Sequence, residues 1–275
     1  MNVLSIQSEV VCGHVGNAAA RFALQRLGHE VWALPTVLLS SHAGYRTVMG
    51  ETVTADLLRR LKEGLDTNGW LALCDAVLSG YLGRPEQAIV VADTVRRVKA
   101  ARPAALYCLD PAFGDAGRAY AKPGVAEAMA RHLLPLADIV TPNAFELGSI
   151  ASIAIRGPQD ALEASRRLGR PVVVTTSVPT KAGRIGTLAA AGDEAFLATT
   201  PLLENPPHGS GDLLAAIFLA CRLQKLSLPD ALAHATGSVF RILSRSEGTE
   251  MALIAEQDAL LAPLLGVDLQ IEAVR

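Results

Sequence analysis

The sequence predicts an α/β fold in which a mostly parallel central sheet carries helices on both faces. Short apolar runs rich in β-branched residues alternate with longer helical patterns, which is typical of parallel strands joined by crossover helices. Hydrophobic residues make up 50% of the chain but aromatics only 4%, so the core is aliphatic, as in a sheet buried on both faces. No Pro-, Ser- or Gly-rich linker divides the sequence, which favours one domain spanning residues 1–275.

Strands are expected where short aliphatic runs end at polar or turn-forming residues. In chain order these are residues 3–6, 31–34, 76–79, 105–109, 139–140, 172–175, 185–190 and 195–198. The last two are joined by Gly192-Asp193, which is a hairpin signal. Helices are expected where apolar residues recur at helical spacing between the strands. In chain order these are residues 17–27, 55–65, 85–101, 124–134, 160–168, 212–223 and 228–243, with a further helix starting near Glu146.

Composition and charge exclude several classes of ligand and location. The net charge is only −2 and no basic stripe is present, so nucleic-acid binding has no electrostatic footprint. No apolar run approaches the roughly 18–20 residues needed to cross a bilayer, so the excess of apolar residues must be core. The four cysteines are widely spaced and no signal-peptide pattern opens the chain. We expect a cytoplasmic protein with reduced thiols, with Cys108 and Cys221 in the core and Cys12 a candidate site-lining thiol.

Polar residues follow most of the predicted parallel strands. In an open parallel sheet the ligand crevice lies outside the carboxyl ends of the strands, so such residues converge along one edge. The residues are Ser8, Ser79-Gly80-Tyr81, Asp110-Pro111, Thr141-Pro142-Asn143 and Thr175-Thr176-Ser177. Each could be ordinary loop chemistry when taken alone, but their number favours a small-molecule site.

The segment Gly209-Ser210-Gly211-Asp212 precedes the apolar run 213–223. Two glycines allow close backbone approach to a ligand, and the helix that follows aims its unpaired N–H groups and positive dipole end at that ligand. Asp212 is a candidate proton acceptor for a hydroxyl, and the dipole is expected to lower its pKa. Phosphoryl transfer uses both features. The alternative is a loop whose Asp merely caps the next helix.

Asp110 and Glu146 are candidate Mg²⁺ ligands, because this ion takes one or two carboxylates and completes its shell with waters and phosphate oxygens. The alternatives are a turn residue before Pro111 and a carboxylate that stabilises the first turn of its own helix. The hydroxyls of residues 175–177 suit nucleotide phosphates, or else a helix cap or turn. Near the N-terminus, the Gly-rich segment from Ser8 is expected to leave the strand and to start a helix capped by Asn17.

A second polar stretch, residues 40–45, could meet this N-terminal segment over a small polar ring. It contains His42, as the first segment contains His14. A lone histidine is more often a surface or satisfied core residue than a ligand contact, and that alternative stays open for both.

A series of short motifs keeps its order along the whole chain. They are Leu4-Ser5-Ile6-Gln7-Ser8, Gly13-His14-Val15-Gly16-Asn17, Ser41-His42 with Gly44-Tyr45, Leu78-Ser79-Gly80-Tyr81, Asp110-Pro111 through Gly114-Asp115, Thr141-Pro142-Asn143 with Glu146, Thr175-Thr176-Ser177 and Gly209 to Asp212. With these motifs the chain resembles the pyridoxal kinases of the ribokinase-like superfamily. The Gly-rich signature is common to the superfamily, whereas the Ser-Ile-Gln-Ser opening and the Ser-Gly-Tyr corner are narrower.

The resemblance implies a three-layer, ribokinase-like fold and ATP-dependent phosphorylation of the 5′-hydroxyl of pyridoxal in vitamin B6 salvage, with pyridoxine and pyridoxamine as further candidate substrates. It implies use of Mg²⁺ and a homodimer. Many members of the family also use a monovalent cation. The resemblance assigns Asp212 as the base and Gly209, Ser210 and Gly211 as the anion hole. The remaining assignments are Asp110 and Glu146 to the metal; Asn143, Glu146, Thr175, Thr176 and Ser177 to the nucleotide; Ser8, His42 and Tyr81 to the pyridine ring; and Asp115 and Tyr120 to a mobile segment.

Two alternatives remain beside this assignment. A hydroxymethylpyrimidine kinase shares the Gly-x-Gly motif and takes a ring of similar size. A catalytically silent relative could bind B6 vitamers as a carrier or sensor, although it would be expected to lack Asp212, Asp110 or Glu146, all of which are present.

Overall fold

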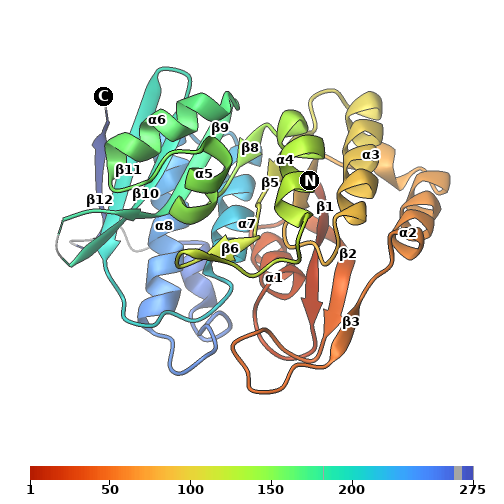
Figure 1. The fold of residues 1–275 in the computed structure, drawn as a ribbon, viewed down its shortest axis with the longest axis horizontal. Coiled ribbons are helices and arrows are strands. Elements are labelled where there is room, and N and C mark those ends of the chain that lie inside the picture. Colours follow the sequence, from red (N-terminus) through yellow and green to blue (C-terminus); the bar gives the residue numbers. More distant parts are fainter. Residues whose placement is uncertain (182, 263–267, 275) are drawn as a thin grey trace.

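The computed structural model describes residues 1–181, 183–262 and 268–274. Within these residues ten strands form one sheet in the order β12-β11-β10-β9-β8-β5-β4-β1-β2-β3 (Figure 1). Its centre, from β9 to β2, is parallel, and antiparallel strands extend both edges. The predicted α/β class and mostly parallel sheet are therefore confirmed.

The strands of the sheet are β1 (Asn2–Val10), β2 (Glu30–Leu39), β3 (Gly50–Thr52), β4 (Ala76–Ser79), β5 (Leu106–Leu109), β8 (Ile139–Val140), β9 (Val172–Pro179), β10 (Arg184–Ala191), β11 (Glu194–Pro201) and β12 (Gln270–Ala273). A separate two-stranded flap consists of β6 (Gly114–Asp115) and β7 (Arg118–Ala119). The helices are α1 (Asn17–Arg26), α2 (Ala55–Thr67), α3 (Glu86–Ala101), α4 (Val125–His132), α5 (Ala144–Ala151), α6 (Pro158–Leu168), α7 (Ser210–Leu223) and α8 (Leu228–Ser244), with short 3₁₀ turns at Trp70–Leu73, Leu134–Leu136 and Gln257–Leu260.

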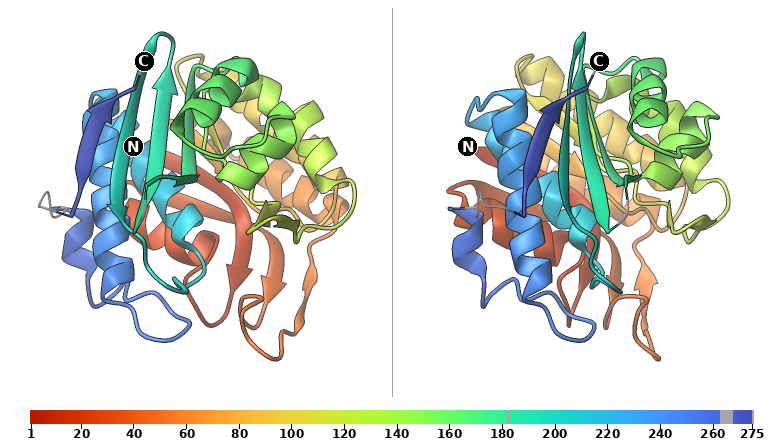
Figure 2. Two further views of the ribbon diagram at one scale, coloured as in Figure 1. Left: turned by 60° about the vertical axis from the view of Figure 1, so that its left-hand side comes forward. Right: turned by 90° about the vertical axis from the view of Figure 1, so that its left-hand side faces the viewer.

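Helices cover both faces of the sheet, which gives three layers (Figure 2). On one face α1, α7 and α8 pack over a continuous aliphatic core. On the other face α2, α3 and α4 cover one half of the sheet, and α5 and α6 cover the half that contains β9 and β10. Helix α7 is buried along most of its length, which explains its unbroken apolar run. This packing fixes its N-terminus at the carboxyl ends of the parallel strands.

Several predicted boundaries are wrong, and the ladder explains two of them. Strand β1 continues beyond Ser8, because β2 also extends and pairs Glu9 with Leu38 after a register shift. Strand β9 continues through residues 175–177, because β10 pairs with it as far as Pro179. Ser8 and the Thr-Thr-Ser segment therefore lie within strands. The short, polar strands β3, β6, β7 and β12 were not predicted.

The N-cap of α1 and the start of α7 also differ from expectation, although α1 begins at Asn17 as predicted. Gly16 rather than Asn17 is the N-cap of α1, and the Asn17 side chain turns back to donate a hydrogen bond to the Gln7 carbonyl at 3.2 Å. Helix α7 begins at Ser210 with Gly209 as its N-cap, and no side chain caps it. Asp212 consequently lies in the first turn, and the alternative in which it merely caps the helix is excluded.

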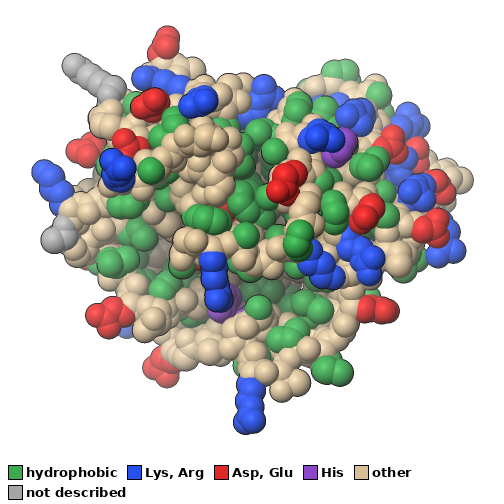
Figure 3. Space-filling view, viewed as in Figure 1, with side chains coloured by type: hydrophobic (Ala, Val, Ile, Leu, Met, Phe, Trp, Pro, Cys, Tyr) green, Lys and Arg blue, Asp and Glu red, His purple; other side chains and the backbone are tan. Residues whose placement is uncertain are grey.

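The surface and cysteines agree with the composition. Acidic and basic side chains are interspersed on the face seen in Figure 3. Among the described residues, no helix has the length and apolarity needed to span a bilayer. Cys108 and Cys221 are buried as predicted, together with Cys74, and Cys12 is exposed.

Candidate active site

The carboxyl edge of the parallel strands brings three predicted carboxylates together. Asp110 directly follows β5, Glu146 lies in the first turn of α5, and Asp212 lies in the first turn of α7. Asp110 is only 5% exposed, and its backbone N–H donates to the Ser79 carbonyl at 2.8 Å, which fixes it against β4. Burial, together with the nearby charges of Asp212 and Glu146, raises the pKa of Asp110 well above its ordinary value.

No cationic side chain in the described part of the chain pairs with this cluster. Among the ion pairs of the described residues, none involves Asp110, Glu146 or Asp212. Nor do the described residues hold three or more His, Cys, Asp or Glu side chains grouped as a complete metal site. A buried, uncompensated set of two or three carboxylates fits a Mg²⁺ ion that takes most of its ligands from water and phosphate.

Glu146 has a structural role that sequence reasoning offered only as the alternative. Its backbone N–H donates to Asn143 Oδ1 at 3.0 Å, and its own Oε2 accepts from the Asn143 N–H at 3.0 Å, which forms a capping box. Its Oε1 accepts from the N–H groups of Phe113 (2.8 Å) and Gly114 (3.1 Å). Glu146 therefore joins the start of α5 to the flap. Burial raises its pKa to about 7, although these backbone N–H groups oppose the rise.

Asn143 shares both tasks. Its Oδ1 caps α5, and its Nδ2 donates to the Gly114 carbonyl at 2.7 Å. These bonds commit the side chain to the cap and the flap, so a direct contact with a nucleotide phosphate stays a prediction.

The turn before α7 has the geometry of an anion site. Gly209 has φ 93°, and a Cβ placed on it would lie 2.0 Å from the His14 carbonyl oxygen, so only glycine fits there. The first intrahelical bond is donated by Leu213 to the Gly209 carbonyl at 3.0 Å, which leaves the preceding N–H groups of the first turn for a ligand. A Cβ on Gly211 would meet nothing within 4 Å, so the helix tip is open.

The expected pKa of Asp212 is corrected by the structure. Burial raises it to about 6, and the Gly16 backbone N–H opposes the rise only in part. The sequence argument from the helix dipole had the opposite sign, because it did not include the loss of hydration among neighbouring carboxylates. Asp212 is still largely ionised at neutral pH.

The predicted nucleotide residues separate into two groups. Thr176 and Ser177 line a cavity of about 140 Å³ with Ser210 and Gly211 of the anion turn. The buried Thr175 hydroxyl instead faces α6, where it lies 3.4 Å from Ser165 Oγ. Thr175 and Thr176 point to opposite faces of β9, so only Thr176 of the two lines the cavity. Ser177 lines it as well, because its positive φ of 56° and a register shift against β10 break the strand alternation there.

Apolar and hydroxyl side chains from β10, β11, the segment after β11 and α8 form most of the remaining wall of this cavity. They include Ile185, Thr200, Leu202, Thr236, Val239 and Leu243. A larger and more open hollow of about 580 Å³ lies beyond Ser177, between the flap turn and α5, and it includes Asp115. None of the carboxylates at 110, 146 and 212 lines either hollow. The three carboxylates therefore lie beside the two cavities rather than within them.

One residue predicted to contact the pyridine ring, Tyr81, lies near one residue predicted for the mobile segment, Tyr120. The rings of Tyr81 and Tyr120 have centroids 6.3 Å apart, and Tyr120 is 51% exposed beside the flap. Burial raises the pKa of the Tyr81 hydroxyl. Ser8 is buried against Gly16, where a Cβ would lie 2.2 Å from Ser8 Oγ.

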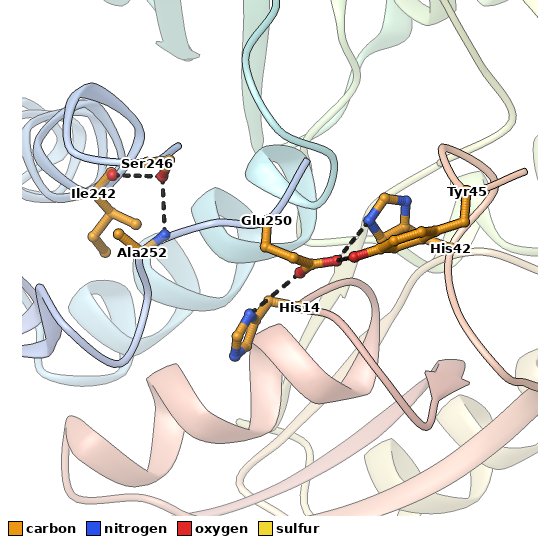
Figure 4. A network of polar contacts seen from close by, with 7 residues as sticks. All are labelled: His14, His42, Tyr45, Ile242, Ser246, Glu250 and Ala252. Atoms are coloured by element: carbon orange, nitrogen blue, oxygen red, sulfur yellow. Dashed lines mark hydrogen bonds and ion pairs between the residues drawn. The ribbon is translucent and has the colours of Figure 1, made fainter. Parts of the chain in front are cut away.

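Sequence reasoning missed Glu250, which lies in the loop after α8 and contacts His42, Tyr45 and His14 (Figure 4). No sequence signal could have found it, because it follows no strand and its partners lie more than 200 positions away. It also changes the expectation for His42. Both ring nitrogens of His42 are engaged, Nδ1 with the Gly44 N–H at 3.1 Å and Nε2 with Glu250 at 2.9 Å.

The fold has three layers, and the N-terminus of α7 offers an anion site with a carboxylate in the first turn and a cavity beside it. This combination defines a small-molecule kinase of the ribokinase-like class. Comparisons with known proteins narrow this class. Residues 63–252 match the family model described as phosphomethylpyrimidine kinase. Pyridoxal kinase PdxY of Rubrobacter xylanophilus is 42% identical over 96% of this chain and 94% of that protein, and PdxY of Corynebacterium diphtheriae is 37% identical over 98% and 99%.

Among solved structures, the pyridoxal kinase from Leishmania donovani in complex with ADP and pyridoxamine superposes with a TM-score of 0.93 at 30% identity, covering 100% of this chain and 99% of that one. The chain belongs to the pyridoxal kinase family.

Proposed function

We propose that this chain transfers the terminal phosphoryl group of ATP to the 5′-hydroxyl of pyridoxal, as one catalytic domain. The observation that carries the proposal is the place of Asp212, in the first turn of α7, beside an open anion turn and next to a cavity that Ser210 and Gly211 help to line. A nucleotide in that cavity would direct its terminal phosphate to the helix tip, where an alcohol beside Asp212 can attack it. The names and bound ligands of the relatives support the same reaction.

The mechanism assigns separate tasks to the turn and to the carboxylate. The free N–H groups of residues 210–212 and the positive end of α7 hold the phosphoryl oxygens and stabilise the charge that develops on them. Asp212 orients the hydroxyl and accepts its proton. A pKa of about 6 suits that task at neutral pH, since the group is ionised yet more basic than an ordinary aspartate.

Asp110 is the residue best placed to hold Mg²⁺, directly or through its waters, because its carboxylate is buried without a cationic partner. Glu146 would act through water, since both of its oxygens already accept backbone hydrogen bonds. When bound, the ion neutralises charge on the nucleotide phosphates. A monovalent cation remains part of the proposal only through the family resemblance.

Thr176 and Ser177 are proposed to face the nucleotide, and the apolar wall from β10, β11 and α8 to cover its base. Ser8 and Tyr81 are proposed to contact the pyridine ring. His42 would contact it through ring carbons, because its nitrogens are occupied. Asp115 and Tyr120 on the flap are proposed to move over the bound substrates.

The test is a coupled ADP-release assay with Mg²⁺ and matched concentrations of pyridoxal and hydroxymethylpyrimidine. ADP formation that depends on pyridoxal and is much weaker with the pyrimidine supports the proposal. The phosphomethylpyrimidine kinase description of the matching family model is the observation that favours the second alcohol. Tight vitamer binding without ADP formation would favour a carrier.

A cytoplasmic homodimer is part of the proposal. Val11, Leu38 and Met49 are exposed apolar residues near the β2–β3 edge, where the Ser40 N–H also pairs with the Met49 carbonyl at 2.7 Å. Light scattering after gel filtration should give twice the mass of the 28.9 kDa chain. A Val11→Glu variant that lowers this mass would place the contact at this edge.

A further inference from the structure

Glu250 joins three segments that are distant in sequence. Its Oε1 accepts hydrogen bonds from the Tyr45 hydroxyl at 2.7 Å and from His42 Nε2 at 2.9 Å, both in the loop between β2 and β3 (Figure 4). Its Oε2 lies 3.6 Å from His14 Nδ1, in the loop between β1 and α1. These bonds outweigh the effect of burial and lower the pKa of Glu250, so the carboxylate is ionised at neutral pH.

The network fixes the orientation and the tautomer of the His42 ring. Because Nδ1 accepts a hydrogen bond from the Gly44 N–H, the proton of the neutral ring lies on Nε2, where it is donated to Glu250. The rings of Tyr45 and His208 pack against the His42 ring in tilted orientations, with centroid distances of 4.8 and 4.9 Å. The His42 side chain is 5% exposed and has no freedom to choose another partner while Glu250 is present.

The loops around this ring are packed closely at two glycines. A Cβ on Gly13 would lie 2.8 Å from Glu250 Oε1, and one on Gly44 would lie 2.7 Å from the His208 ring. His208 directly precedes the anion turn, and the His14 carbonyl touches Gly209. Glu250 therefore binds side chains of two loops, and it contacts no residue of the anion turn itself; among its partners, only His14 does so, through its backbone.

We propose that Glu250 is a positioning residue, which holds His42 and the two substrate-side loops in the arrangement that receives the vitamin ring. The identity of that ring rests on the proposed function. Glu250 acts through His42 and is assigned no contact with the reacting atoms, so its loss should weaken ring binding and leave the phosphoryl-transfer step and the nucleotide site unchanged.

The test compares Glu250→Ala, Glu250→Gln and a matched control. Calorimetry measures pyridoxal binding without nucleotide, and steady-state assays measure kcat and both KM values. For Glu250→Ala we expect the pyridoxal Kd and KM to rise about tenfold, from the loss of two charge-assisted hydrogen bonds, with kcat and the ATP KM within twofold. In Glu250→Gln the amide oxygen can still accept from His42 and Tyr45, so most of the affinity should return.

Glu256→Ala is the control, because Glu256 is similarly half-buried in the same region but pairs with Arg241 at 2.8 Å instead. It should leave pyridoxal affinity unchanged. Wild-type affinity in Glu250→Ala, or an equal loss in Glu256→Ala, overturns the inference. If the wild-type protein binds pyridoxal but forms no ADP, the proposed function fails while the binding comparison still decides the role of Glu250.

Discussion

Asp110 at the end of β5 and Asp212 at the start of α7 lie close enough that the charge of Asp212 adds to the rise that burial causes in the pKa of Asp110. Two carboxylates held together without a cationic side chain weaken the empty protein and favour a bound cation. The two residues nevertheless have different surroundings. Asp110 is fixed by a strand end, whereas Asp212 stands beside the open tip of α7, which suits the first to a metal and the second to a proton.

Asp212→Asn should keep nucleotide binding and lose turnover by about 10²–10⁴-fold, because the amide cannot accept the proton of the hydroxyl. Nucleotide affinity by calorimetry and ADP release measure the two effects. The matched control is Asp230→Asn, which changes an aspartate in the first turn of α8 and should leave turnover unchanged. Unimpaired turnover in Asp212→Asn would remove this residue from the mechanism.

The same substitution should stabilise the protein in a pH-dependent way. The native pKa of Asp212, about 6, lies above the ordinary value of 3.8, so the native state binds the proton more tightly than the unfolded state does. Ionisation therefore lowers the free energy of unfolding as pH rises from about 4 to 6, and the loss persists above that range. Asp212→Asn should gain about 1–2 kcal/mol at pH 8 and clearly less at pH 5 in urea unfolding. A gain that is equal at both pH values would contradict the raised pKa.

Thr175 and Thr176 should respond differently to replacement by valine. Thr176→Val removes a hydroxyl that lines the cavity beside the anion turn and should raise the ATP KM about three- to tenfold. Thr175→Val removes the contact with Ser165 and should cost about 1 kcal/mol of stability with no change in the ATP KM. Kinetics and urea unfolding of the pair test this division, and the reverse pattern would show that the two side chains were assigned to the wrong faces.

Glu146→Ala should destabilise the protein by about 2–4 kcal/mol, because the N–H groups of Phe113, Gly114 and Asn143 lose their acceptor. Equilibrium unfolding in urea measures the change. The control is Glu86→Ala, in which an exposed glutamate in the first turn of α3 is removed; it should cost less than about 0.5 kcal/mol. Equal effects of the two substitutions would mean that the capping and flap bonds of Glu146 contribute little.

The buried centre of the fold could be predicted from sequence, because β5 and the parallel strands around it are runs of apolar residues that only a sheet covered on both faces accommodates. The edge strands could not. Gly50–Thr52 and Gln270–Ala273 are short, largely exposed and held by their neighbours rather than by an apolar pattern.

In the site, the sequence could predict that Asp110, Glu146 and Asp212 converge, because strand order and the rule for carboxyl ends place them together. It could not predict which of Thr175 and Thr176 faces the cavity, since that depends on where β9 ends. The contacts of Glu250 depend on how loops distant in sequence pack together, and the pKa of Asp212 depends on burial. Neither the loop packing nor the burial can be seen in the local sequence.

The double attachment of Glu146 ties helix α5 to the flap. One carboxylate both completes the capping box and accepts the N–H groups of Phe113 and Gly114, so the first turn of α5 cannot fray without releasing the flap. The two regions should behave as a single opening unit in native-state hydrogen exchange, with the amides of residues 113, 114, 143 and 146 exchanging at one common rate. Access to the catalytic edge would then be governed by the local unfolding equilibrium of a helix end.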